Sequence, residues 1–330
     1  MKAKTFHRVK LMKSKTTIFF PNVDQALLSA LRLELYRHGY EFSESASTAD
    51  VVFHVKTDAF VDKDQRNILL QLEPFCVDAQ QYSTRKMRRF DYVIPLSRYR
   101  AENLNSPIWL DMPVLKRKAV FSNRRDEQAT MVNAAKFSAY KMSNYGLRRE
   151  VLVLDAANDA RVDLFGDHWN ERISVEIRRR LASVRATPFH KIDFCEAFSH
   201  SGYRYPQHKG KISQGFEEVQ KYRTAIVIEN QSDYVSEKIW KFLFNGVVPV
   251  YVGPNLSFDR QIEEFIEVVP PKPDVILERA LQITENDRMR KIRNFLKFID
   301  SKEFQHYSPE NCAHKFVESL LSHRLLDFKT

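Results

Sequence analysis

Residues 222–254 read YRTAIVIENQSDYVSEKIWKFLFNGVVPVYVGP. The segment TAIVIEN (residues 224–230) contains an unbroken apolar run, which is typical of a strand covered on both faces. Asp233 is a candidate N-cap for the helix that follows, and the Asn-Gly pair at 245–246 ends that helix. The apolar stripe of the helix comprises Val235, Ile239, Phe242 and Leu243. VVPVYVG then predicts another buried strand, so the stretch predicts a strand–helix–strand unit with a right-handed crossover.

Four polar residues of this unit are candidates for ligand binding. Ligands of such units bind beyond the carboxyl ends of the strands, where Glu229 and Asn230 lie. Glu237 and Lys238 lie about one turn into the predicted helix, where free backbone N–H groups and the helix dipole favour a phosphate. Lys238 would add a positive charge and Glu237 would accept hydrogen bonds from sugar hydroxyls, so together they could hold a sugar diphosphate. The alternative interpretation is a pair of solvated surface residues.

The rest of the chain alternates strand-like and helix-like segments. In the first half, strands are predicted at TTIFF (16–20), DVVFHV (50–55), NILLQL (67–72) and DYVIPL (91–96), and a helix at NVDQALLSALRLELYRHGY (22–40). In the second half, strands are predicted at KAVFS (118–122) and RVDLFG (161–166), helices within 126–145, at 171–181 and from Pro273 onward, and a long loop at 187–215. This alternation predicts an α/β fold with parallel sheets.

A proline-containing connector, SPIWLDMPVLKR (106–117), separates the two series. We therefore expect two Rossmann-like domains that face each other across a cleft, residues 1–115 and residues 116–330. The last helices of the second domain could pack back on the first.

Composition restricts the cellular setting. The chain has 330 residues, a formal net charge of +10 and 43% hydrophobic residues. Its three cysteines, Cys76, Cys195 and Cys312, form no CxxC pair, which argues against a disulfide framework and fits a reducing compartment. The basic N-terminal stretch lacks the apolar centre of a signal peptide, and no apolar run reaches the roughly 18 residues of a transmembrane helix. We expect a cytoplasmic protein, with peripheral contact at the inner membrane as a further expectation.

The stretch at 222–254 closely resembles the donor-binding signature of the family-10 glycosyltransferases, the α-1,3/4-fucosyltransferases. In that family a strand ends in Glu-Asn, a Tyr-Val-Thr-Glu-Lys helix start follows, and a Val-Pro-Val strand ends in Gly. The matching residues here are Glu229, Asn230, Tyr234, Glu237, Lys238, Pro249 and Gly253, with Ser236 in place of the common Thr.

Weaker similarities follow in family order from about residue 70. KAVFSNRR resembles a Val-Ser-Asn strand end that precedes a phosphate-binding Arg, which makes Asn123, Arg124 and Arg125 donor-binding candidates. The family Arg usually lies several residues beyond the Asn, whereas both arginines here follow Asn123 directly. LQLEPF resembles the acceptor-side segment, so Glu73 is the candidate base, with a local turn cap before Pro74 as the alternative.

The resemblance implies a GT-B-like pair of domains, an N-terminal acceptor-side domain and a C-terminal domain that binds GDP-fucose. It also implies inversion at the sugar carbon, with direct attack by a hydroxyl of a glycan acceptor. Glu73 would take the hydroxyl proton, and Lys238 with Arg124 or Arg125 would stabilise the leaving diphosphate. Tyr234 would stack on or hydrogen-bond the donor, or serve packing only, and Glu229 would contact the ribose or close the strand end.

No metal ligands are predicted, because no motif of the chain suggests a metal-held diphosphate and the cluster His190, Asp193 and Cys195 is short and lies in a loop. Stimulation by Mn²⁺ is compatible with this mechanism, since a free ion can help GDP leave. A cluster of basic residues comprises Arg85, Lys86, Arg88 and Arg89. It is either a solvated face or a docking surface for an anionic acceptor or an acidic membrane. The competing functions are transfer from another nucleotide sugar and, from a different class, nucleic-acid binding by a basic protein without a recognised motif.

Overall fold

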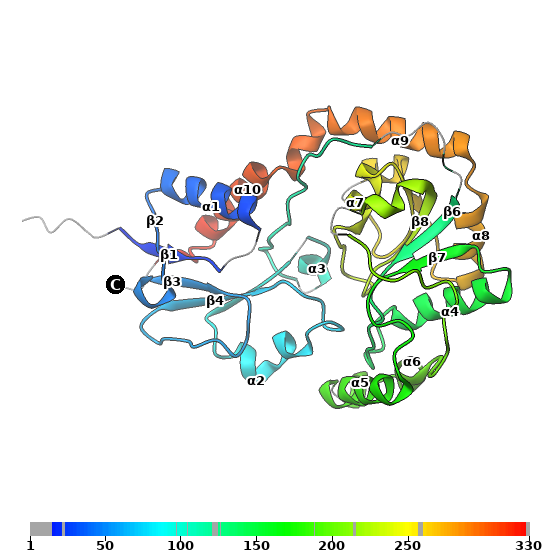
Figure 1. The fold of residues 1–330 in the computed structure, drawn as a ribbon. Coiled ribbons are helices and arrows are strands. Elements are labelled where there is room, and N and C mark those ends of the chain that lie inside the picture. The colour runs from blue at the N-terminus through cyan, green and yellow to red at the C-terminus, as the bar shows by residue number, and fades with distance from the viewer. Residues whose placement is uncertain are drawn as a thin grey trace, which may run out of the picture.

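The computed structural model describes residues 15–21, 24–96, 98–103, 105–120, 125, 127–187, 189–213, 216–256 and 260–327. These residues form two parallel β-sheets, each with helices packed against it, and the two sheets lie beside each other along the molecule (Figure 1). This is the expected α/β architecture of two Rossmann-like units.

The first sheet has the strand order β2-β1-β3-β4-β5, and all of its pairings are parallel. Its strands are β1 (Thr17–Phe19), β2 (Glu41–Phe42), β3 (Val51–His54), β4 (Arg66–Gln71) and β5 (Tyr92–Pro95). Four of these strands coincide with the segments predicted from apolar runs. The two-residue strand β2 was not predicted, because it is too short for a periodic pattern.

The second sheet has the order β10-β9-β8-β6-β7 and is also parallel. Its strands are β6 (Glu127–Val132), β7 (Val162–Phe165), β8 (Tyr222–Ile228), β9 (Val248–Val252) and β10 (Glu267–Val268). The strands β8 and β9 pair directly, and α7 between them gives the strand–helix–strand unit predicted from residues 222–254. The buried side chains of Ile226, Val227 and Ile228 confirm the prediction of a strand covered on both faces.

The α-helices are α1 (Gln25–Arg37), α2 (Thr84–Met87), α3 (Arg98–Asn103), α4 (Tyr145–Ala157), α5 (Ile173–Ala186), α6 (Phe194–Phe198), α7 (Lys238–Phe244), α8 (Pro273–Gln282), α9 (Glu285–Ile299) and α10 (Pro309–Ser322). Local chemistry sets several of their ends. The Asp24 carboxylate accepts hydrogen bonds from the backbone N–H groups of Ala26 and Leu27 at the start of α1. A capping box of Thr284 and Asp287 begins α9.

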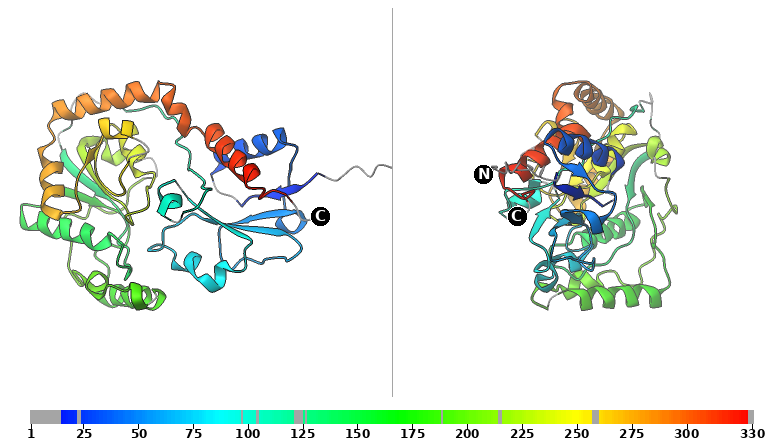
Figure 2. Two further views of the ribbon diagram at one scale, coloured as in Figure 1. Left: turned by 180° about the vertical axis from the view of Figure 1, so that it is seen from behind. Right: turned by 90° about the vertical axis from the view of Figure 1, so that its left-hand side faces the viewer.

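The chain returns to the first sheet at its C-terminal end. Helix α9 runs across from the second sheet, and α10 then lies against α1 in both side views (Figures 1 and 2). The Phe316 ring of α10 lies 6.1 Å from the Phe53 ring of β3 and 6.3 Å from the Phe20 ring. The last helix is therefore part of the core beneath the first sheet. A domain boundary between residues 115 and 116 remains a prediction.

Three local predictions were wrong. Residues 118–120 are not part of a strand, and the strand of this region is β6, which lies within the segment assigned to a helix at 126–145. Helix α7 begins at Lys238 with Glu237 as its N-cap, so Asp233 is not the N-cap. The long loop at 187–215 contains α6 and a short 3₁₀ helix, Phe189–Lys191. Each error arose where a short polar or mixed segment carried no clear apolar period.

Candidate active site

The carboxyl ends of β4, β6 and β8 lie at the boundary between the two sheets and place charged side chains there. Glu73 follows β4, Lys136 follows β6, and Lys238 begins the helix after β8. Electrostatic interactions join Glu73 to Lys136, Glu237 and Lys238. Of the predicted site residues, the fold therefore brings together Glu73 from the first sheet and the Glu237–Lys238 pair from the second.

Glu73 is held by its backbone rather than by its carboxylate. Its carbonyl oxygen accepts hydrogen bonds from the Tyr82 hydroxyl at 2.8 Å and from Arg100 Nη1 at 3.2 Å. Within the described residues, its half-buried carboxylate has no hydrogen-bond partner and no ion pair. Burial, with the carboxylates of Glu237 and Asp78 nearby, raises the pKa of Glu73, while Lys136 and Lys238 oppose that rise. A carboxylate with these properties suits proton transfer better than the capping of a turn.

Glu229 is the opposite case, a carboxylate that is fully buried at the end of β8. Its Oε1 accepts a hydrogen bond from the backbone N–H of Ser236 at 2.8 Å, while burial raises its pKa. Gly253 must stay small beside it, because a Cβ there would lie 2.9 Å from Glu229 Cγ and 2.2 Å from the Tyr251 hydroxyl oxygen. Glu229 thus fixes the loop between β8 and α7 from within the protein.

Lys238 is the first residue of α7 and is half-buried. Burial lowers its pKa, and the carboxylates of Glu229 and Glu237 partly offset that effect. No ion pair to Lys238 occurs among the residues that the structure describes. The helix has only seven residues, so the ammonium group rather than the helix dipole supplies the positive charge at this point.

Glu237 lies beside Lys238 but has a different environment. Its side chain is 63% exposed and forms an ion pair with Lys241 at 3.2 Å, one turn further along α7. It is the N-cap residue of α7 but makes no side-chain cap hydrogen bond. Its carboxylate is therefore accessible to a ligand.

Sequence analysis missed two positive residues at this edge, Lys136 and Arg148. Lys136 lies four residues after the end of β6, a strand that sequence analysis did not place. Arg148 of α4 is buried, and its Nη2 donates to the Asn230 side-chain oxygen at 2.9 Å while its Nε donates to the Ile228 carbonyl at 3.0 Å. Asn230 is thus tied to α4, and nothing in a helical arginine would have marked this contact in advance.

Direct contacts between the two halves of the molecule position the site. The Phe75 ring lies 4.4 Å from the Tyr140 ring, and the backbone N–H of Cys76 donates to Gln231 Oε1 at 3.3 Å. Tyr234, predicted to contact the donor, packs partly buried against the core of the first sheet. The segment after β4, which includes Glu73, is therefore docked on the edge of the second sheet.

Of the three donor-binding candidates at residues 123–125, the structure describes only Arg125. Asn123 and Arg124 are outside the described residues. Arg125 is 3% exposed, and its Nη2 donates to the Asn245 carbonyl at 3.0 Å at the C-terminal end of α7, the end opposite Lys238. Burial and the neighbouring Arg288 lower the pKa of Arg125 to about 10. In this structure Arg125 is not brought together with Lys238.

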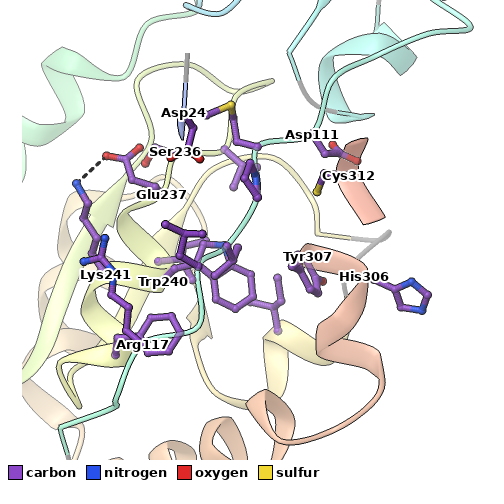
Figure 3. Close-up of a pocket in the computed structure, with 18 of the residues that line it drawn as sticks. Asp24, Asp111, Arg117, Ser236, Glu237, Trp240, Lys241, His306, Tyr307 and Cys312 are labelled. Atoms are coloured by element: carbon purple, nitrogen blue, oxygen red, sulfur yellow. Dashed lines mark hydrogen bonds and ion pairs between the residues drawn. The ribbon is translucent and has the colours of Figure 1, made fainter. Parts of the chain in front are cut away.

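A cavity of about 1220 Å³ begins at Glu73 and Glu237 and continues beneath the segment at residues 111–120 towards η6 (Glu303–Tyr307) and α10. Figure 3 shows Trp240 and Tyr307 among the side chains that line it, together with the Glu237–Lys241 ion pair. Lys238, Glu229 and Asn230 do not line it. Of the predicted site residues named here, the cavity therefore reaches only Glu73 and Glu237.

In the part of the chain that the structure describes, no group of possible metal ligands lies beside Glu73 and Lys238. The cluster of His190, Asp193 and Cys195 does not form such a group in the structure. An Asp-Lys-Asp triplet does occur at residues 62–64, before β4, at the end of that strand opposite Glu73. The acidic groups of the triplet therefore cannot act on a ligand bound beside Glu73. Among the described residues, no helix has both the length and the apolar character needed to cross a membrane.

No protein-family model matches the chain. Two solved structures of Anabaena Alr3699/HepE, one in complex with UDP-glucose and one with UDP and glucose, align with TM-scores of 0.51 and 0.52. Their sequence identities to this chain are 11% and 9%, and the alignments cover 93% and 94% of this chain and 99% and 100% of theirs. The chain spans just over half of the larger structures it also matches, 57% of a chain of the GtfA/B complex and 55% of S. aureus TarM. The two parallel α/β units and the similarity to the HepE structures show that the fold of this chain is GT-B-like.

Proposed function

We propose that this protein is an inverting glycosyltransferase that moves a sugar from a nucleotide-sugar donor to a hydroxyl group of a glycan acceptor. One observation carries this proposal. Within the described part of the chain, Glu73, a carboxylate without a partner, lines one cavity with Glu237, the neighbour of Lys238, whose ammonium group has no ion pair. Direct displacement of a diphosphate needs this combination, since a proton must leave the acceptor while negative charge grows on the leaving group.

The donor would lie on the side of the second sheet. Lys238 and Lys136 would neutralise the diphosphate, and the accessible carboxylate of Glu237 would accept hydrogen bonds from sugar hydroxyls. Asn230 would contact the donor through its backbone or amide, and Glu229 would keep the β8–α7 loop in place from beneath. Asn123 and Arg124 remain candidates for the phosphate from the sequence pattern, and Arg125 would reach it only after a rearrangement.

The acceptor would approach from the side of the cavity. Glu73 lines the cavity, so a hydroxyl group bound there would meet its carboxylate, and the donor would lie beyond it at Lys238. The cavity exceeds the roughly 300–1,000 Å³ of ordinary ligand pockets, which leaves room for an oligosaccharide end. Its lining includes the cations Arg117, Lys118 and Lys315 and also carboxylates such as Asp24, Asp111 and Glu303, so it offers hydrogen-bonding groups of both charges to an acceptor.

The identity of the donor as GDP-fucose rests on the resemblance of residues 222–254 to the fucosyltransferase signature, and no metal cofactor is required in this scheme. Peripheral membrane contact would use Arg85 and Arg88 of the α2 region, which are exposed. Arg89 is less available, because its guanidinium group donates to the carbonyl oxygens of Thr57 and Ala59.

A thermal-shift panel of GDP, UDP, CMP and their sugars tests this proposal. We expect GDP and GDP-fucose to raise the melting temperature most, since a ligand at 100 times its dissociation constant adds about 2.7 kcal/mol to the stability. A selective response to UDP-glucose would keep the glycosyltransferase proposal and replace the donor. No response to any nucleotide or nucleotide sugar would contradict the proposal.

A further inference from the structure

A cluster of two histidines and two glutamates joins α1 to α10, far from the cleft. Glu34 and His38 are four residues apart on α1, and His314 and Glu318 are four residues apart on α10. This spacing places both side chains of each pair on one face of its helix. The two helices pack closely against each other (Figure 1), so the two faces meet.

Glu34, His314 and Glu318 converge on a small volume, and His38 lies beside the two carboxylates. Glu34 Oε1 lies 2.8 Å from His314 Nδ1 and 3.5 Å from His38 Nε2, and His38 Nε2 lies 3.2 Å from Glu318 Oε1. The ligand atoms of Glu34, His314 and Glu318 all lie within 4.8 Å of one another. Around a tetrahedral Zn²⁺ with bonds of about 2.0–2.1 Å, neighbouring ligand atoms are roughly 3.3 Å apart. The Glu34–His314 separation of 2.8 Å and the 4.8 Å limit on the other pairs enclose that value.

We propose that Glu34, His314 and Glu318 bind one divalent transition-metal ion, best matched by Zn²⁺, that fastens α10 to α1, with His38 as a hydrogen-bonding neighbour of both carboxylates. Imidazole nitrogens and carboxylate oxygens are both ligands of Zn²⁺. The two carboxylates carry a charge of −2, of which Arg37 offsets one unit through its ion pair with Glu34, and a divalent ion would offset the rest.

The surroundings of Glu34 support a fixed ligand. This residue is 5% exposed, so its carboxylate is held by its neighbours rather than by water. Arg37 Nη1 donates to Glu34 Oε2 at 2.8 Å, which directs Oε1 towards the histidines. An outer partner of this kind orients a metal-binding carboxylate. His38 is about one-third exposed and His314 more than half, so an ion can reach the cluster from solvent.

The consequence of such a site is structural. Helix α10 follows the second sheet in the chain but packs on the first, so an ion between α1 and α10 would secure this return. Binding of an ion to the folded state alone stabilises that state. The bound ion would stabilise the folded state and hold the C-terminal helix in place. This role does not depend on the proposed transferase activity.

The test uses the full chain, stripped of metal with a chelator and dialysed, then titrated with Zn²⁺ by calorimetry and by thermal unfolding. We expect one Zn²⁺ per chain and a higher melting temperature on binding. The double variant His38→Ala/His314→Ala should lose at least 100-fold in affinity, while His323→Ala, a histidine just beyond α10 and outside the cluster, should bind as the wild type does.

A second variant separates metal binding from simple ion pairing. His314→Lys keeps a positive partner for Glu34 but supplies no ligand to Zn²⁺, and it serves as the comparison if the double variant does not fold. We expect it to fold and to bind Zn²⁺ at least 10-fold more weakly. Absence of Zn²⁺ binding by the wild type, or stoichiometric binding that persists in both cluster variants, would overturn the proposal.

Discussion

Two carboxylates, Glu73 and Glu229, occupy corresponding places at the carboxyl ends of β4 and β8, yet their surroundings differ. Burial raises the pKa of both. The Glu229 carboxylate is fully enclosed and accepts the Ser236 backbone N–H, whereas within the described residues the Glu73 carboxylate has no hydrogen-bond partner and lines a cavity. The comparison teaches that a perturbed pKa alone does not identify a catalytic group. Access and the absence of a structural partner separate the chemical candidate from the structural one.

Replacement of Glu73 should have the largest effect. Glu73→Gln keeps the shape of the side chain but cannot accept a proton, so we expect the rate of sugar transfer to fall by about 10²–10⁴. The melting temperature should change little. Transfer assays with Glu229→Gln as the matched variant check this, and near-normal transfer by Glu73→Gln would remove Glu73 as the base.

Replacement of Lys238 should come next. We expect Lys238→Ala to lower the turnover number by about 10²–10³, because a fixed cation that faces developing charge contributes several kcal/mol to the transition state. Lys241→Ala on the same helix is the control, since its ammonium group is already paired with Glu237. Equal turnover numbers for the two variants would mean that Lys238 has no special role in the transition state.

The sequence predicted some of the elements around Glu73 and Glu229 and missed others. The apolar runs of β4 and β8 predicted both strands, and the residues after them predicted both carboxylates. The short α7 and the misplaced β6 were beyond an apolar pattern, because polar turns replace the first helical turn and β6 lies within a mixed segment. The burial of Glu229 depends on Gly253 and Tyr251 of the next strand, and the docking of Phe75 on Tyr140 joins residues 65 positions apart. Contacts between residues so far apart in the chain leave no pattern in the local sequence.

A stability measurement sharpens the structural side of the comparison. We expect Glu229→Ala to reduce the free energy of unfolding by about 1–3 kcal/mol, because the buried N–H of Ser236 loses its acceptor. Glu237→Ala should change it by less than about 0.5 kcal/mol, since that side chain is exposed. Denaturant titrations of the two variants give the comparison, and equal losses would contradict the structural role of Glu229.

The pH dependence of stability should show the smallest effect. A carboxylic acid whose pKa is raised in the folded state stabilises that state below its unfolded pKa, and this contribution is lost as the pH rises through the folded pKa. The unfolding free energy of the wild type should therefore fall more steeply with rising pH in this range than that of Glu229→Gln. Parallel profiles would mean that Glu229 does not titrate differently in the folded state.

The central claim, that the donor binds at Lys238 while Glu73 acts on the acceptor, is tested most directly by calorimetric titration of GDP-fucose into two variants. The account predicts that Glu73→Gln keeps the dissociation constant of the wild type within about threefold, because Glu73 makes no donor contact. It predicts that Lys238→Ala weakens binding at least tenfold, which corresponds to the loss of about 1.4 kcal/mol from one charged contact. Equal weakening in both variants, or wild-type affinity in Lys238→Ala, would contradict the division of roles between the two sides of the cleft.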